Sequence, residues 1–264
     1  MEISVSFFAG IPYIVTMIDI PQRFQAVYRT SPLQAGIRLI PFNFVIALGS
    51  VLVNVIVAKT RIPAIILLFV GTVLQIVGIS LISFLPAGPN IPAAIYGYEV
   101  LAGLGIGTII GLTLVLPPLV TNSSDFGMLP PTSMTKVLLL SLNHLAMLAG
   151  AVLQFRIFGG AIGLAVALTV GNNYFNSHVR DIVTDEQRGN LLKSVEFISQ
   201  IRSETQARVL KILVDSYNLR MRSLIAFSAA QFVAVALLWK KQQIIIKKNS
   251  DEATEPDSLQ PTAV

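Results

Sequence analysis

Long apolar segments alternate with short polar connections along most of this sequence. These segments extend over residues 3–18, 36–58, 64–85, 91–120, 137–175 and 223–240. A helix crosses the hydrocarbon part of a bilayer with about 20 mostly apolar residues, and the segments are near or above that length. Because backbone groups in lipid have to bond within their own segment, such segments are expected to be helical. The pattern therefore predicts an all-α, polytopic membrane helix bundle with about six transmembrane spans.

The segment 137–175 is the hardest to divide into spans. It is apolar except for a few polar positions, of which Arg156 is the strongest interruption. The segment is too long for one ordinary span and barely long enough for two. A seventh apolar segment near 136–153 therefore stays open at this point.

The same pattern divides the chain into four regions. Residues 1–175 form a transmembrane bundle of five spans, with an insertion near 126–145. An extracytoplasmic loop occupies 176–222, and the last transmembrane span occupies 223–240. The polar tail that follows, 241–264, has the acidic and Ser/Pro-containing composition of a disordered segment, and we place it in the cytoplasm.

The extracytoplasmic loop contains apolar residues at helical spacing, with charged residues between them. This spacing predicts an amphipathic helix, and its apolar positions are Leu191, Val195, Ile198 and Ile201. Such a helix either covers the loop and rests on the membrane surface or binds a specific partner.

Basic residues beside the span ends predict the orientation, because short cytoplasmic loops are enriched in lysine and arginine. The clearest basic sites are the turn with Lys59 and Arg61 and the flank at 240–248. If both are cytoplasmic, the loop at 176–222 lies outside. That orientation requires an odd number of spans in the segment 137–175, which favours one helix there.

Composition narrows the classes of function. The chain is 53% hydrophobic and 12% charged, whereas soluble domains are about 25% charged. It has no cysteine and only two histidines, His144 and His178, which leaves little for a metal centre. Its net charge of +5 is scattered, which disfavours a nucleic-acid partner. Hydrolase, protease and phosphate-loop motifs are missing, so we predict no enzyme activity, no catalytic residue, no metal and no cofactor.

Glycines recur at helical spacing in two of the apolar segments. Gly103, Gly107 and Gly111 are four residues apart, and Gly159 and Gly163 repeat that spacing. Small residues on one face of a membrane helix let two backbones approach closely. The pattern predicts close-packed helix faces, and the alternative is a helix that slides or rocks against its neighbour.

Two carboxylates at membrane depth are the candidates for proton coupling, since charge in lipid is expensive and tends to be functional. Glu99 lies inside the apolar segment 91–120, and Asp19 lies at the end of the first span. The alternative for Glu99 is a carboxyl bonded to a neighbouring helix, and for Asp19 an interfacial cap.

Five further polar residues are candidates for lining a substrate path or bonding between helices. Arg156 is either an interfacial anchor or a counter-charge within the bundle, and Arg38 presents the same choice. The other three are the amide side chains Gln75, Asn43 and Asn54. Amide side chains commonly form hydrogen bonds between membrane helices.

Several stretches, taken in order, carry a resemblance to a known family. They are residues 20–28 (IPQRFQAVY), 30–41 (TSPLQAGIRLIP), 95–100 (IYGYEV) with the glycines behind it, 154–164 (QFRIFGGAIGL) and 217–222 (YNLRMR). In sequence and spacing they resemble the C-terminal half of fungal major facilitator superfamily transporters with fourteen spans, of the drug:proton antiporter type.

The resemblance covers most of residues 5–240. It implies half of a major facilitator fold, made of the last six spans of fourteen. It also implies export of a small organic substrate, such as a drug or toxin, through a central cavity and driven by a proton gradient. The implied partners are the lipid bilayer, the substrate and protons. The implied location is that of an integral, multi-pass protein of the plasma membrane rather than the vacuolar membrane.

Two features depart from the family pattern. Transporters of this family have an N-terminal half that carries the motifs gating the pore, and no part of this chain resembles it. A missing N-terminal half is therefore an expected partner. Residues 126–145 interrupt the usual passage from the glycine-rich span to the next one. The alternative function is accordingly a non-transporting membrane fragment or a structural or regulatory membrane protein.

We hypothesise that a retained intron or an erroneous gene model accounts for the insertion, because removing most of residues 126–145 restores one ordinary span. Sequencing the transcript tests this hypothesis. We expect most messages to lack the codons for residues 127–144, and a message that keeps them in most copies would contradict the idea.

Overall fold

Six long helices make up the part of the chain that the computed structural model describes, which is residues 2–60, 62–86, 88, 90–121, 134–180, 182–183 and 203–237. They are α1 (Glu2–Tyr28), α2 (Pro32–Lys59), α3 (Ala64–Ser83), α4 (Ala94–Thr121), α5 (Met134–Val179) and α7 (Ser203–Leu237). Each of the six contains a stretch that is long and apolar enough to cross a membrane. The predicted all-α bundle with six spans is confirmed.

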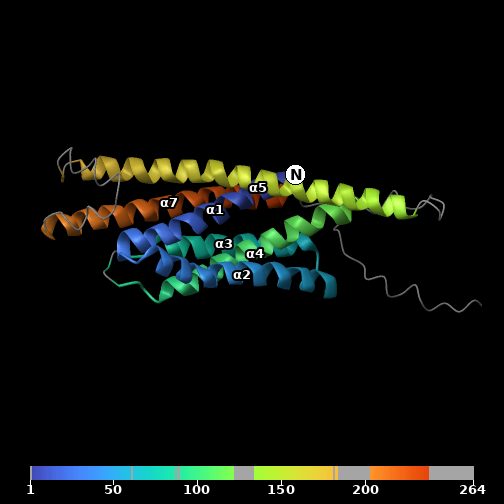
Figure 1. The fold of residues 1–264 in the computed structure, drawn as a ribbon, viewed down its shortest axis with the longest axis horizontal. Helices are drawn as coiled ribbons and strands as arrows, with labels where there is room; N and C mark the ends of the chain where they lie inside the picture. Colours follow the sequence, from blue (N-terminus) through green and yellow to red (C-terminus); the bar gives the residue numbers. More distant parts are fainter. Residues whose placement is uncertain are drawn as a thin grey trace, which may run out of the picture.

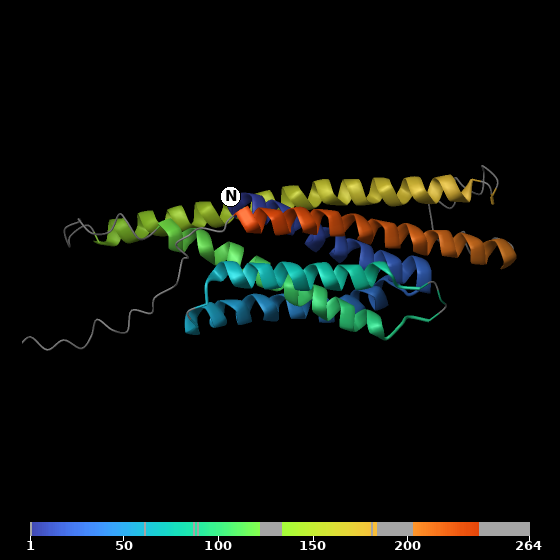
Figure 2. The ribbon, with the colours of Figure 1, turned by 180° about the vertical axis from the view of Figure 1, so that it is seen from behind.

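The helices lie lengthwise beside one another, and successive helices run in opposite directions (Figure 1). One side of the bundle is made of α2, α3 and α4, and the other of α1, α5 and α7, as the view from behind also shows (Figure 2). We call the two ends of the bundle the Tyr28 end and the Lys59 end. The predicted orientation would place the Lys59 end in the cytoplasm, and it stays a prediction.

The turn before α2 shows how the sequence sets a helix start. The Ser31 hydroxyl oxygen accepts a hydrogen bond from the Gln34 backbone N–H at 3.3 Å, which satisfies one of the free donors of the first turn. Pro32 takes the first helical position, where its missing N–H costs nothing. At the other end, Lys59 lies in the last turn, where a basic side chain interacts well with the free carbonyls.

The first span is longer than the sequence pattern predicts. We expected it to end at residue 18, but α1 continues through Pro21 to Tyr28 and buries Asp19 completely. The prediction that Asp19 lies at a span end was therefore wrong. The physical reason is that Asp19 and Arg23 find polar partners inside the bundle, so they do not need the water interface.

One other boundary differs from the predicted one, and two agree. The helix α4 continues through Pro117 and Pro118 to Thr121, close to the predicted end of its segment at residue 120. Neighbouring helices can satisfy the backbone groups that prolines leave free, which is why membrane helices tolerate them. The helix α5 runs without a break past Arg156, as the orientation argument favoured. The helix α7 begins at Ser203, so it includes residues that we assigned to the loop.

Several predicted regions lie partly or wholly outside the described residues. They include the amphipathic helix at 191–201 and the tail at 241–264. Of the insertion near 126–145, residues 134–145 belong to the first turns of α5 and residues 126–133 lie outside. The division into four regions stays a prediction.

The helix α4 packs closely against α2 along one row of glycines. A Cβ atom on Gly107 would overlap the backbone carbonyl of Ile46, and one on Gly111 would lie 2.7 Å from the Ser50 carbonyl oxygen. A Cβ on Gly103 would lie 3.1 Å from the Phe42 carbonyl oxygen. All three positions therefore face the backbone of α2. A larger side chain at any of them would keep the two helix backbones further apart.

The opposite side of α4 packs in the same way against α3. A Cβ atom on Gly105 would overlap the backbone at Gln75, and one on Gly71 would lie 3.2 Å from the Gly105 carbonyl oxygen. A Cβ on Gly78 would likewise collide with Ala102 of α4. The glycine-rich helix is thus held between two neighbours, with glycines on both contact faces.

A third close contact joins α1 and α5. A Cβ atom on Gly159 would overlap the Phe7 carbonyl oxygen, and one on Gly163 would overlap the Ile11 side chain. From the other helix, a Cβ on Gly10 would overlap the carbonyl of Arg156. This crossing sets the distance between the two helices at the level of Arg156.

Substituting Gly107 with alanine is expected to destabilise the bundle, because the added methyl group would meet the backbone of α2. Overpacking of this kind typically costs about 1–3 kcal/mol. Heat denaturation of the purified protein in detergent measures the effect as a lower unfolding temperature.

The matched control is Gly97→Ala, which adds the same methyl group to the same helix. No described atom beyond its immediate surroundings lies within 4 Å of that position. This variant should be as stable as the parent or slightly more stable, since alanine favours helix over glycine by about 1 kcal/mol. Equal losses in both variants would contradict the close packing of α4 on α2.

Candidate functional site

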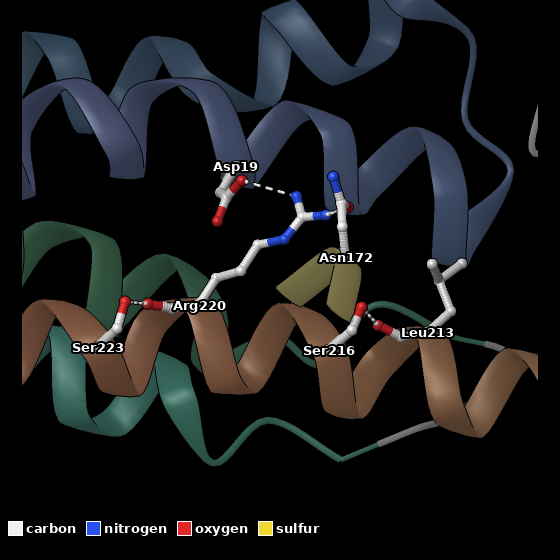
Figure 3. A network of polar contacts seen from close by, with 6 residues as sticks. All are labelled: Asp19, Asn172, Leu213, Ser216, Arg220 and Ser223. Carbon is white, nitrogen blue, oxygen red and sulfur yellow. Dashed lines mark hydrogen bonds and ion pairs between the residues drawn. The ribbon is translucent and has the colours of Figure 1, made fainter. Parts of the chain in front are cut away.

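A buried ion pair joins α1 and α7 near the Tyr28 end. The Arg220 Nη1 atom lies 3.3 Å from Asp19 Oδ1, and both side chains are buried. The other terminal nitrogen of Arg220 donates a hydrogen bond of 2.8 Å to Asn172 Oδ1 of α5. Figure 3 shows the guanidinium group reaching from α7 toward Asp19 and Asn172. Three helices therefore share one arginine.

A second arginine, one helical turn after Asp19, extends this polar cluster. Arg23 is 2% exposed and donates to Asn218 Oδ1 of α7 at 2.8 Å. It also donates at 3.2 Å to the carbonyl oxygen of Leu85, which follows the end of α3 in the chain. The Asn218 amide donates to the same oxygen at 3.1 Å. Positions four apart lie on one helix face, so Asp19 and Arg23 both point toward α7. We call these five residues, Asp19, Arg23, Asn172, Asn218 and Arg220, the polar clasp.

Glu99 has a different environment from Asp19. It lies in the second turn of α4 and is fully buried. Within the described residues, neither of its carboxylate oxygens has a hydrogen-bond partner. The alternative that Glu99 bonds to a neighbouring helix is therefore not seen in the described part of the chain. A buried carboxylate without partners costs several kcal/mol or more when it is ionised, so its role needs an explanation.

Arg38 stays at the edge of the bundle, near the start of α2. Its Nη1 atom donates to the Tyr96 hydroxyl oxygen of α4 at 3.0 Å, and its guanidinium lies 5.9 Å from the centre of the Phe24 ring. The side chain is half-buried. Arg38 thus links three helices at the Tyr28 end without an acidic partner in these contacts.

Arg156 lies toward the other end of the bundle. Its Nη2 atom donates to the Thr113 hydroxyl oxygen of α4 at 2.7 Å, and the side chain is 4% exposed. The structure therefore does not place Arg156 at an exposed interface. It also does not place Arg156 beside Glu99, because Thr113 and Glu99 are fourteen residues apart on one helix, or about 21 Å.

The three amide candidates have two kinds of contact. Gln75 is fully buried, and its amide nitrogen donates to Ser228 Oγ at 3.0 Å and to Gln231 Oε1 at 3.1 Å, both on α7. Asn43 and Asn54 instead donate to carbonyl oxygens of their own helix. Gln75 therefore bonds between helices, and the contacts of the two asparagines stay local.

The sequence analysis missed most of the polar clasp. Arg23 stood in a predicted connection, and Arg220, Asn218 and Asn172 stood in or beside a predicted loop. The spacing of Asp19 and Arg23, four residues apart and thus on one helix face, was the signal that could have placed both inside. The resemblance covered residues 217–222, but it carried no contact information.

The described residues offer no metal site built from side chains. No group of three or more histidine, cysteine, aspartate or glutamate side chains comes together in that part of the chain. What the geometry does offer is one polar cluster built around the Asp19–Arg220 ion pair. Three buried charges, Arg23, Glu99 and Arg156, have no ion pair in the contacts described, and of these Arg23 has two neutral acceptors, Arg156 has one and Glu99 has none.

Replacing Arg220 with glutamine is expected to destabilise the bundle strongly, because it leaves Asp19 buried and unpaired. Breaking a buried ion pair from one side typically costs about 3–5 kcal/mol. Thermal unfolding in detergent measures the loss. The double variant Asp19→Asn with Arg220→Gln should recover part of it, because no uncompensated charge remains.

Arg222→Gln is the control for this prediction. Arg222 lies two residues further along α7 and contacts the Phe84 ring at 5.0 Å from its centre. Exposed contacts of this type contribute about 0.5–1 kcal/mol, so the variant should lose little stability. Similar losses for Arg220→Gln and Arg222→Gln would contradict the central position of the Asp19–Arg220 pair.

Comparison with known proteins identifies relatives of this sequence. No protein-family model matches the chain. The MFS-type transporter FPY5 of Fusarium mangiferae is 35% identical over 236 residues, which are 89% of this chain and 36% of that protein. The MFS-type efflux pump LUC4 of a Fusarium species is 24% identical, over 83% of this chain and 37% of the relative. The MFS-type transporter gkaD of Penicillium citrinum is 25% identical, over 94% of this chain and 40% of the relative.

The coverage is uneven in the same way for each of these relatives. Most of this chain is matched, but it spans only a little more than a third of their length. Together with the six helices that are long and apolar enough to span a membrane, the matches describe an integral, multi-pass membrane protein. The chain is homologous to fungal MFS-type transporters over that part of their length, and the predicted resemblance to the major facilitator superfamily is confirmed.

Proposed function

We propose that this chain forms one helix bundle of a proton-coupled exporter of small organic compounds in the plasma membrane. The relatives named as MFS-type transporters and efflux pumps support transport as the class of function. Because the chain spans only part of their length, the transport activity belongs to a complete assembly that includes a second bundle. Substrate passage between two such bundles is the usual arrangement in transporters built from repeats.

The observation that carries the proposal is the environment of Glu99. Its carboxyl group is fully buried in α4, and its oxygens have no hydrogen-bond partner among the described residues. An ionised carboxylate in such a site is costly, so Glu99 needs a proton or a partner that arrives during the transport cycle. A site that gains and loses a proton as its surroundings open is what coupling to a proton gradient requires.

Asp19 is the second candidate, and its surroundings favour Glu99 over it. Asp19 already has a fixed counter-charge in Arg220, and Arg220 is held from its other side by Asn172. Proton uptake by Asp19 would have to break this ion pair. In the proposed mechanism Asp19 therefore holds the helices together, and Glu99 carries the coupled proton.

The packing of α4 supports a role in movement. Glycines on both contact faces let its backbone lie directly against the backbones of α2 and α3. Two packed helices can then slide or rock past each other at small cost, as shear movements of domains do. We propose that α4 moves in this way and thereby changes the exposure of Glu99.

Glu99→Gln is expected to abolish proton-coupled export, because glutamine cannot bind and release a proton. The chain would be produced in yeast cells without their own drug exporters, together with a separately expressed N-terminal bundle of an MFS-type transporter. Efflux of the fluorescent dye rhodamine 6G, with and without a protonophore, measures the activity.

Asp215→Asn is the matched control, since it removes a carboxylate that is only partly buried on α7. We expect this variant to export the dye at the parental rate. Full export by Glu99→Gln would contradict the role of that residue. No export by the parental chain, despite its insertion in the membrane beside the second bundle, would favour a structural or regulatory membrane protein instead.

A further inference from the structure

Arg156 is a buried cation with a neutral partner. Its side chain is 4% exposed, and its terminal Nη2 atom bonds to the Thr113 hydroxyl oxygen at 2.7 Å. Its Nε atom is buried and has no hydrogen-bond partner within the described residues. A guanidinium group has five N–H donors in one plane, so the Thr113 contact uses only part of its capacity.

The described carboxylates inside the bundle do not neutralise this charge. Asp19 and Glu99 are the acidic residues among the buried side chains that the structure describes. Asp19 already pairs with Arg220. Glu99 lies fourteen residues before Thr113 in the same helix, which corresponds to about 21 Å. A charge that is buried without compensation is costly at this depth, so its retention calls for an anion from elsewhere.

The groups around Arg156 can orient an anion but cannot replace it. The hydroxyl hydrogen of Thr113 is directed to carbonyl oxygens of its own helix, 2.8 Å away at Ile109 and 3.2 Å away at Ile110. The Thr113 oxygen is therefore free to accept from Arg156, and it fixes the guanidinium group without neutralising it. Tyr13 of α1 is close enough for an electrostatic interaction with Arg156. The partners described for the cation are thus two hydroxyl-bearing side chains, and neither is a carboxylate.

We propose that Arg156 binds the carboxylate of an amphipathic organic anion. A guanidinium group matches a carboxylate with two parallel hydrogen bonds, which gives both strength and orientation. The apolar body of the compound would contact neighbours such as Ile109 and Val152, both of which are buried. As the substrate class of an exporter this inference rests on the proposed function, whereas the binding itself can be tested without transport.

The test uses the full chain in phosphatidylcholine nanodiscs with radiolabelled 1-naphthaleneacetate as the probe. Its neutral analogue 1-naphthaleneethanol has nearly the same apolar body, and empty nanodiscs correct for partition into lipid. We expect the acid to bind about tenfold tighter than the alcohol, because a charge-assisted hydrogen bond to a buried cation contributes that much. Equal binding of acid and alcohol would overturn the proposal.

Arg156→Gln should remove the preference for the acid, and Arg156→Lys should keep part of it, since lysine keeps the charge without the planar fork. The matched control is Arg38→Gln, because Arg38 also bonds to a hydroxyl group of α4, at 3.0 Å from Tyr96. Arg38→Gln should bind both probes like the parent. If Arg156→Gln does not fold, the lysine variant decides: an unchanged preference for the acid over the alcohol would then count against the planar recognition.

Three further outcomes separate this inference from a lipid ligand and from the proposed function. If nanodiscs with phosphatidylserine abolish binding of the acid, a lipid headgroup occupies the site and the organic anion is the wrong ligand. If the dye is exported in a Glu99-dependent manner but the acid is not preferred, the proposed function stands and this inference fails. If the acid is preferred but no export occurs, the binding site stands without the exporter.

Discussion

A charged side chain inside a membrane-spanning bundle can be satisfied only by other groups of the bundle, and this constraint organises the structure. The polar clasp meets it with two arginines, one aspartate and two asparagines drawn from α1, α5 and α7. Each partner is fixed by at least one other, so the three helices have little freedom to rotate about their axes at the Tyr28 end. The same contacts explain why α1 can continue past Asp19 and Pro21 without reaching water.

Close backbone contact is the second condition for such a bundle, since apolar side chains gain little by leaving lipid for protein. The glycines of α4 bring it against α2 on one face and α3 on the other, and Gly159 brings α5 against α1. Their contribution is dispersion over a large area rather than any single bond. The side made of α1, α5 and α7 is held by both the specific bonds of the clasp and a glycine contact, and the side made of α2, α3 and α4 is held by glycine contacts.

The sequence was sufficient for the parts of this arrangement that depend on local pattern. Six spans follow from hydropathy, and the row of Gly103, Gly107 and Gly111 follows from a period of four. It was insufficient where a span contains charges. By hydropathy alone the first span ends before Asp19, and the last span starts only after Arg222. The partners of Asp19 and Arg23 lie about 200 positions further along the chain, and no local pattern carries that pairing. The amide of Gln75 could be predicted to bond between helices, but its choice of α7 required the fold.

Glu99 and Arg156 are informative because the same bundle shows that it can pair charges elsewhere. Glu99, Ile106 and Thr113 follow one another at intervals of seven residues, or about two helical turns, so they lie on one face of α4. This face lies between the contacts of α4 with α2 and with α3. The carboxylate lies at one end of this face and the arginine is bound at the other, so neither can compensate for the other. A fold selected for stability alone would have paired such groups or replaced them with apolar ones, which is commonly neutral or stabilising. Their partners are therefore best sought among species that arrive and leave, a proton at Glu99 and an anion at Arg156, and α4 is the helix that connects the two sites.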